Sequence, residues 1–155
     1  MKKPWNLGYE KSKQKAKEIY SKIGRIQSPA FGGELVAFTS AGFNHLVRKG
    51  RIPRPKNEQK RRFTLIPYVE QIIKNPKATL LYERRETRYV TDRHGKKVTI
   101  QSVADFWTFV EIIENCKIKV VVRQLDTDGP KHFLSVMGDD ATTAKRRHKI
   151  KKPPK

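Results

Sequence analysis

The residue best suited to acid–base chemistry near neutral pH is His45, which lies in a short segment of small and apolar residues between Phe38 and Val47. An imidazole titrates near neutrality, so it can take a proton from a ribose 2′-OH or deliver one to a departing 5′-oxygen. An ordinary core or surface histidine is the alternative, and the spacing alone does not exclude it.

A dense group of cations follows His45 directly. Residues 48–62 contain eight bases and one acid, Glu58; the bases are Arg48, Lys49, Arg51, Arg54, Lys56, Lys60, Arg61 and Arg62. Such a cluster can hold a scissile phosphate and offset negative charge in a transition state. The alternative is a solvated basic loop. Lys49 lies about one turn after His45, so it adds positive potential to the same helical face.

A second polar set lies near the end of the chain, where Arg123 precedes a tight turn and His132 and Ser135 follow it. In a regular strand, His132 and Leu134 share one face, whereas Phe133 and Ser135 share the other. His132 and Ser135 therefore do not point into one site if the strand is regular. We favour Ser135 as the site residue and interpret His132 as a turn-end residue.

Metal and cofactor chemistry have little support. The four histidines lack metal-ligand spacing, Gly32-Gly33 is not followed by the Lys-Ser/Thr of a phosphate-binding loop, and Asp139-Asp140 has no partner carboxylates. Cys116 is the single cysteine, which excludes an internal disulfide framework. We therefore expect no metal and no cofactor.

The overall charge indicates a polyanionic partner. The 155 residues carry 35 Lys and Arg against 15 Asp and Glu, a formal net charge of +20, and nucleic acid is the first partner class for such a chain. No apolar run approaches the ~20 residues of a membrane span, and no secretory signal follows Met1. We expect a cytoplasmic monomer that binds RNA and not a membrane.

The charge also divides the chain. Residues 1–27 suit a basic helical extension, 28–138 one folded domain, and 139–155 a disordered basic tail that follows a phosphate backbone.

The patterning predicts helices first and strands second. Helices are expected over 11–23, ended by Gly24, over about 40–50 with Thr39 or Ser40 as N-cap, and over 58–74, entered or interrupted at Pro67. In the second helix we expect Ala41, Leu46 and Val47 to face the core. Strands are expected over 78–92, 97–100, 118–125 and 132–137, and Arg93-His94-Gly95-Lys96 is expected to form the turn of a hairpin between the first two. Segment 103–113 suits either a strand or a short helix. The predicted class is α+β, with N-terminal helices on a roughly four-stranded antiparallel meander.

Three motifs carry a resemblance to a known superfamily. They are Phe38-Thr39-Ser40-Ala41-Gly42-Phe43-Asn44-His45, then Arg61-Arg62 leading to Leu65-Ile66-Pro67, and finally Val120-Val121-Val122-Arg123 with His132-Phe133-Leu134-Ser135-Val136. Residues 36–136 resemble the phage and mobile-element branch of the barnase–EndoU–colicin–RelE (BECR) ribonucleases.

The resemblance implies metal-independent RNA cleavage by 2′-OH attack, which leaves a 2′,3′-cyclic phosphate. It assigns His45 as general acid or base, Arg62 (or its neighbour Arg61) and Arg123 as phosphate ligands, and Ser135 as a hydrogen-bonding residue. The second proton-transfer group stays open, with His132 and Tyr89 as candidates. A toxin or mobile-element effector of this kind takes RNA, including tRNA, as target and an acidic immunity or antitoxin protein as partner. A non-catalytic RNA- or ribosome-binding module is the alternative, and a DNA-binding protein lacks a clear recognition helix.

Overall fold

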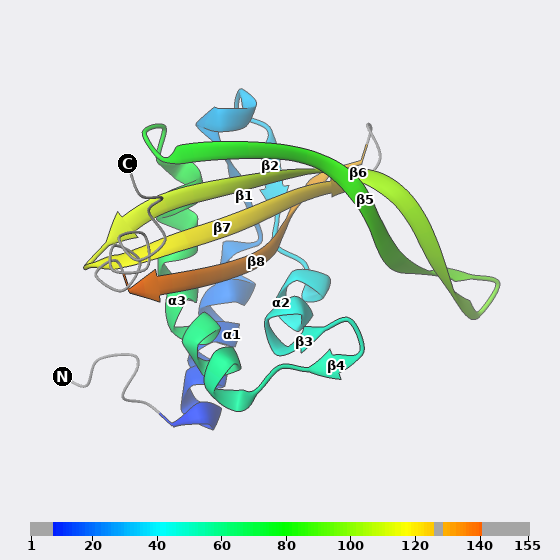
Figure 1. Cartoon of the computed structure of the whole chain (residues 1–155), viewed down its shortest axis with the longest axis horizontal. Helices are drawn as coiled ribbons and strands as arrows, with labels where there is room; N and C mark the ends of the chain where they lie inside the picture. Colours follow the sequence, from blue (N-terminus) through cyan, green and yellow to red (C-terminus); the bar gives the residue numbers. More distant parts are fainter. Residues whose placement is uncertain (1–7, 126–128, 141–155) are drawn as a thin grey trace, which may run out of the picture.

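The computed structural model describes residues 8–125 and 129–140 and shows three helices and a mixed sheet (Figure 1). The helices are α1 (Tyr9–Ile23), α2 (Ser40–Val47) and α3 (Lys56–Lys74), with a short 3₁₀ turn at Pro29–Phe31. The large sheet contains β1 (Arg25–Gln27), β2 (Leu35–Ala37), β5 (Thr79–Arg93), β6 (Lys96–Ile113), β7 (Cys116–Leu125) and β8 (Lys131–Asp140). A small hairpin, β3 (Arg48–Lys49) with β4 (Ile52–Pro53), connects α2 to α3.

The sheet confirms the α+β class and the antiparallel meander, and it is larger than expected. Its strand order is β1-β2-β8-β7-β6-β5. Strands β5 to β8 form the meander, and β2 joins the edge of β8 in parallel over only two residue pairs. The remaining length of β8 therefore has an open edge, which α2 and α3 approach. No helix within the described residues is long and apolar enough to cross a bilayer.

The N-terminal segment is part of the core, which corrects its assignment as an extension. The side chains of Ala16 and Tyr20 in α1 are buried, and the Tyr20 hydroxyl donates a hydrogen bond to the Thr39 carbonyl at 2.6 Å. Ile26 of β1 is also buried. Tyr9, Ile19 and Ile23 of α1 also pack against this core, so the whole apolar face of the helix is used. Residues 1–7 lie outside the described part of the chain.

The C-terminal boundary moves as well. Strand β8 continues through Asp139 and Asp140, both assigned to the tail from sequence, because they pair with Lys117 and Cys116 of β7. The rest of the predicted tail, 141–155, lies outside the described residues.

Helix α2 begins as expected after Thr39 and ends at Val47, because Arg48 and Lys49 turn into the β3–β4 hairpin. Phe43 and Leu46 are buried, whereas Ala41 is exposed, so the prediction that Ala41 faces the core is wrong. The cause is the close approach of α2 to β8 at Gly42. A Cβ at that position would lie 2.5 Å from the Phe133 carbonyl oxygen. Helix α3 continues through the exposed Pro67 without a break.

Strands β5 and β6 extend well beyond the rest of the sheet. The ambiguous segment 103–113 belongs to β6, and the two strands pair in register from Thr79↔Val110 to Arg93↔Lys96. Strand β7 pairs with β6 only from Ala104 onward, so residues 86–103 form a two-stranded arm (Figure 1). The arm closes through His94 and Gly95, both with positive φ, as the predicted turn requires.

The two faces of the meander have different environments. On one face, Phe109, Val120 and Phe133 pack in the main core with α1 and α3. On the other face, a smaller cluster contains Ala104, Phe106 and Val121.

A β-bulge changes the facing of β8 residues. Val122 pairs with Phe133, but Val121 pairs with Ser135, which leaves Leu134 as an extra residue. His132 and Leu134 share one face and Phe133 is buried in the main core, as the alternation predicts. The bulge interrupts the alternation at Ser135, because a bulge places two residues opposite one.

Candidate functional site

A wide groove lies on the face of the sheet that α1 and α3 leave open. Its floor includes the cross-strand row Phe106–Arg123–His132, one residue from each of β6, β7 and β8. Helix α2 contributes His45 and Asn44 to one wall, and the β5–β6 arm forms the opposite wall. The groove thus combines residues from seven elements, namely β2, α2, β3, β5, β6, β7 and β8.

The lining of the groove is strongly basic. Among the described residues that line it, six are cations (Arg48, Arg51, Arg85, Arg88, Lys97 and Arg123) and two are anions (Glu86 and Asp92). Low-dielectric walls of one charge sign concentrate counter-ions at a cleft. The groove is therefore suited to a polyanion.

The centre of the floor is a hydrogen-bonded pair, Arg123 and His132. The Arg123 Nε–H donates to His132 Nε2 at 3.2 Å. The pKa of His132 is lowered to about 4, first by burial and second by the charge of Arg123, while a hydrogen bond with the Pro130 backbone opposes the shift. Burial and then the charge of Arg85 lower the pKa of Arg123. His132 is therefore neutral at pH 7, with its Nε2 lone pair directed at a cation.

His45 lies in a second, similarly cationic environment. Burial is the largest cause that lowers its pKa to about 4, followed by the charges of Arg54, Arg62, Arg123 and Lys49. Because Arg123 acts on both imidazoles, the two histidines share one positive neighbour. Both are neutral in the free protein, and an anion bound between them would raise both pKa values.

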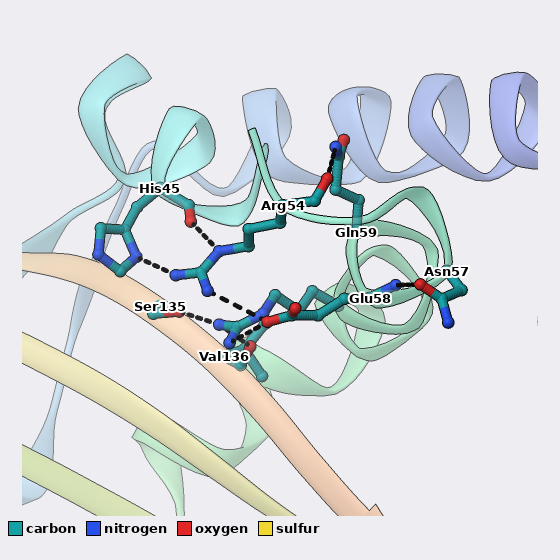
Figure 2. Close-up of polar contacts among 8 residues, drawn as sticks. His45, Arg54, Asn57, Glu58, Gln59, Ser135 and Val136 are labelled. Atoms are coloured by element: carbon teal, nitrogen blue, oxygen red, sulfur yellow. Dashed lines mark hydrogen bonds and ion pairs between the residues drawn. The ribbon is translucent and has the colours of Figure 1, made fainter. Parts of the chain in front are cut away.

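A chain of charged contacts connects His45 to the edge of β8 (Figure 2). The Arg54 Nε–H donates to the His45 carbonyl oxygen at 3.0 Å, and Arg54 Nη2 lies 3.5 Å from His45 Nδ1. The carboxylate of Glu58 accepts from Arg54 at 3.1 Å and from Arg62 at 3.2 Å. Arg62 Nη1 then donates to Ser135 Oγ at 2.7 Å and to the Val136 carbonyl at 3.2 Å.

This chain changes the roles expected of Arg54, Arg62 and Ser135. The Arg54 and Arg62 side chains are only 9% and 12% exposed, and Ser135 is 2% exposed. Their polar atoms bind one another, so they are not directed into the groove. Arg62 donates a hydrogen bond to the Val136 carbonyl on the edge of β8, where no other strand of the described residues pairs, and so attaches α3 to β8. In this structure the three side chains contact protein groups, whereas the sequence predicts Arg54 and Arg62 as phosphate ligands and Ser135 as a hydrogen-bonding partner of a phosphate oxygen or the ribose.

The remaining basic candidates divide between the groove and other surfaces. Arg51 lines the groove, and Lys49 lies close enough to lower the pKa of His45. Lys56 lies 5.2 Å from the centre of the Tyr9 ring. Arg61 lines a separate hollow with Lys117 and Lys119. Lys56, Lys60 and Arg61 all belong to α3 and do not line the His45 groove.

Sequence reasoning undervalued His132, and it predicted the hairpin around His94-Gly95 without indicating that this hairpin lines the groove. His132 was interpreted as a turn-end residue, yet it pairs in register with Arg123. The signal was present, because the two residues flank one tight turn and a hairpin places such residues opposite each other. No comparable signal pointed to Arg85, Arg88 or Lys97, since their position depends on the arm.

Within the described residues, no three His, Cys, Asp or Glu side chains come together as a metal site. Comparison with known proteins finds no matching family model, no matching curated protein and no matching solved structure.

Proposed function

We propose that this chain is an endoribonuclease that cleaves RNA by attack of a ribose 2′-OH, without a metal ion. The observation that carries the proposal is the pair of neutral histidines that flank Arg123 in a basic groove. Two imidazoles and a guanidinium supply the base, the acid and the charge stabilisation that this reaction needs. The resemblance of residues 36–136 to BECR ribonucleases supports the same chemistry.

The reaction balances with these groups alone. A base removes the 2′-OH proton, the 2′-oxygen forms a bond to phosphorus, and the bond from phosphorus to the 5′-oxygen breaks. An acid protonates the departing 5′-oxygen, which gives a 2′,3′-cyclic phosphate and a 5′-OH. Arg123 stabilises the additional negative charge on the phosphoryl oxygens.

The contacts of the two histidines favour different roles. The Pro130 backbone stabilises the protonated form of His132, and the Nε2 atom of His132 accepts a hydrogen bond from Arg123. When Arg123 turns to the phosphate, this lone pair becomes available, so we assign His132 as the base. Arg54 lies against Nδ1 of His45, which leaves Nε2 to carry the proton toward the groove. We therefore assign His45 as the acid, whose pKa rises when the phosphodiester binds.

The test is cleavage of a labelled RNA in excess EDTA by the unmodified chain, His45→Ala and His132→Ala. We expect 2′,3′-cyclic phosphate ends from the unmodified chain and a loss of at least ~100-fold in rate in each variant. His94→Asn is the matched control, because His94 lies exposed at the tip of the arm. Full activity in either groove variant would contradict the assignment of that histidine.

The same pKa values predict an acid-shifted pH profile. Since kcat/KM reports the groups of the free enzyme, its optimum should lie well below the 6.5 of an ordinary histidine pair. An optimum at pH 7 or above would be inconsistent with the proposed pair.

A non-catalytic RNA-binding module is the second candidate, and one observation favours it. With both pKa values near 4, neither His45 nor His132 carries appreciable imidazolium at pH 7 in the free protein. Tight RNA binding without cleavage at any pH between 4 and 8 would support this candidate. In either case we propose RNA, including tRNA, as the ligand and an acidic antitoxin as a protein that would occupy the groove.

A further inference from the structure

The β5–β6 arm, residues 86–103, exposes apolar side chains to solvent although only two strands hold it together. Residues 86–103 pair only with each other, and an isolated two-stranded hairpin is marginally stable in water. Val90 and Val103 of the arm are 58% and 42% exposed. A surface of this kind is stabilised when a partner covers it.

One side of the arm faces the groove. The cross-strand pairs Asp92↔Lys97 and Val90↔Thr99 both line it, together with Arg88. Arg48 and Arg51 line the groove from the β3–β4 hairpin. The β3–β4 hairpin wall is therefore basic, whereas the arm lines the groove with two cations, Arg88 and Lys97, and two anions, Glu86 and Asp92. His132 lies on the floor, and His45 lies on the α2 wall.

The charge selects the class of partner. The chain carries a net charge of +20, so a second copy would be repelled and a polyanion attracted. Proteins that hold unpaired strands use aromatic side chains on which bases stack. Among the described lining residues the one aromatic is Phe106, and the Arg85 guanidinium lies 4.1 Å from its ring centre. Base-paired RNA, by contrast, is recognised through its backbone and shape.

We propose that the arm and the β3–β4 hairpin grip the backbone of a base-paired RNA stem across the groove. This inference rests on the proposed function, because it names the substrate class of the same site. The arm is then a specificity element, which directs the chain to folded RNA and not to unpaired strands.

A shortened arm tests the proposal. Deletion of residues 88–93 and 96–101 joins Thr87 and Ser102 through His94-Gly95. Thr87 and Ser102 are paired in register, and six residue pairs are removed, so the turn keeps its pairing type. Binding is measured in a His45→Ala background with three probes: an RNA hairpin, an unstructured RNA of the same length and composition, and a DNA hairpin of the same sequence.

Two charge variants keep the test valid if the shortened chain fails to fold. R88Q/K97Q removes two cations that line the groove, whereas R93Q/K96Q removes two cations next to the turn that do not line it. The change in net charge is identical. A loss of RNA affinity in R88Q/K97Q but not in R93Q/K96Q therefore reports direct contact with the RNA and not overall charge attraction.

We expect the chain with the full-length arm to bind the RNA hairpin at least ~10-fold more tightly than it binds the unstructured RNA or the DNA hairpin. We expect R88Q/K97Q to bind the RNA hairpin about 10-fold more weakly, and the slope of log affinity against log salt concentration to fall by about two. We expect R93Q/K96Q to lose less than about 3-fold in hairpin affinity. Equal binding of unstructured RNA, equal binding of the DNA hairpin, or equal loss in both charge variants would each overturn the proposal. Selective hairpin binding without cleavage by the unmodified chain would instead leave the arm's role intact and refute the nuclease.

Discussion

Lowering the pH from 7 to 5 should destabilise the folded chain through His45 and His132. Each has a pKa of about 4 in the folded protein, against roughly 6.5 when unfolded. Between these values the unfolded chain binds a proton that the folded chain does not, so stability is complete above pH 6.5 and falls as the pH drops toward 4. From pH 7 to 5 the loss is about 1 to 2 kcal/mol for each histidine, because solvent screens part of the interaction of these partly exposed imidazoles.

The assay is urea unfolding at pH 7 and pH 5 for the unmodified chain and for His45→Gln, His132→Gln and the double variant. Carboxylates contribute a common background, so the histidine effect is the difference between variants. The double variant should lose much less stability than the unmodified chain over this pH range. His94→Asn is the control, because His94 is exposed and asparagine tolerates its positive φ. An equal loss in the unmodified chain and the double variant would refute the buried, cation-flanked environment described for the two imidazoles.

Three further outcomes are expected. Gly42→Ala should destabilise the fold by about 3 kcal/mol in urea unfolding, because its Cβ would lie 2.5 Å from the Phe133 carbonyl oxygen, and an unchanged midpoint would contradict this close approach. Ser135→Ala should lower the melting temperature and reduce the free energy of unfolding by about 1–3 kcal/mol, because it removes the 2.7 Å hydrogen bond from the largely buried Arg62. An unchanged melting temperature would show that the Val136 carbonyl and Glu58 are enough to satisfy the Arg62 guanidinium. Arg54→Gln should raise the pKa of His45 part of the way toward 6.5 in an NMR titration, since one neighbouring cation is lost while burial remains; an unchanged pKa would exclude Arg54 as a cause.

Much of the local structure follows from short-range patterns. Thr39 precedes α2, Gly24 ends α1 with a positive φ, and His94-Gly95 forms the turn of the arm, each as the sequence predicts. These features depend on neighbours only a few residues apart, which is why caps, turns and periodicity indicate them. Segment 103–113 was ambiguous because its strand identity comes from pairing with β5 and β7.

The sequence by itself determined the large positive charge and the α+β class, and it singled out the region around His45 as a candidate site. Only the tertiary structure decided which of the cations face the groove. Arg51 lines it, whereas Arg62, eleven residues later, contacts Ser135, which is 73 positions away. The reason is geometric, because contacts between distant segments decide which way each side chain of a helix or strand points. In β8, the extra residue of the bulge also changes the face on which the following residues lie. The same long-range pairing places His132 beside Arg123 and turns two separate histidines into one candidate site.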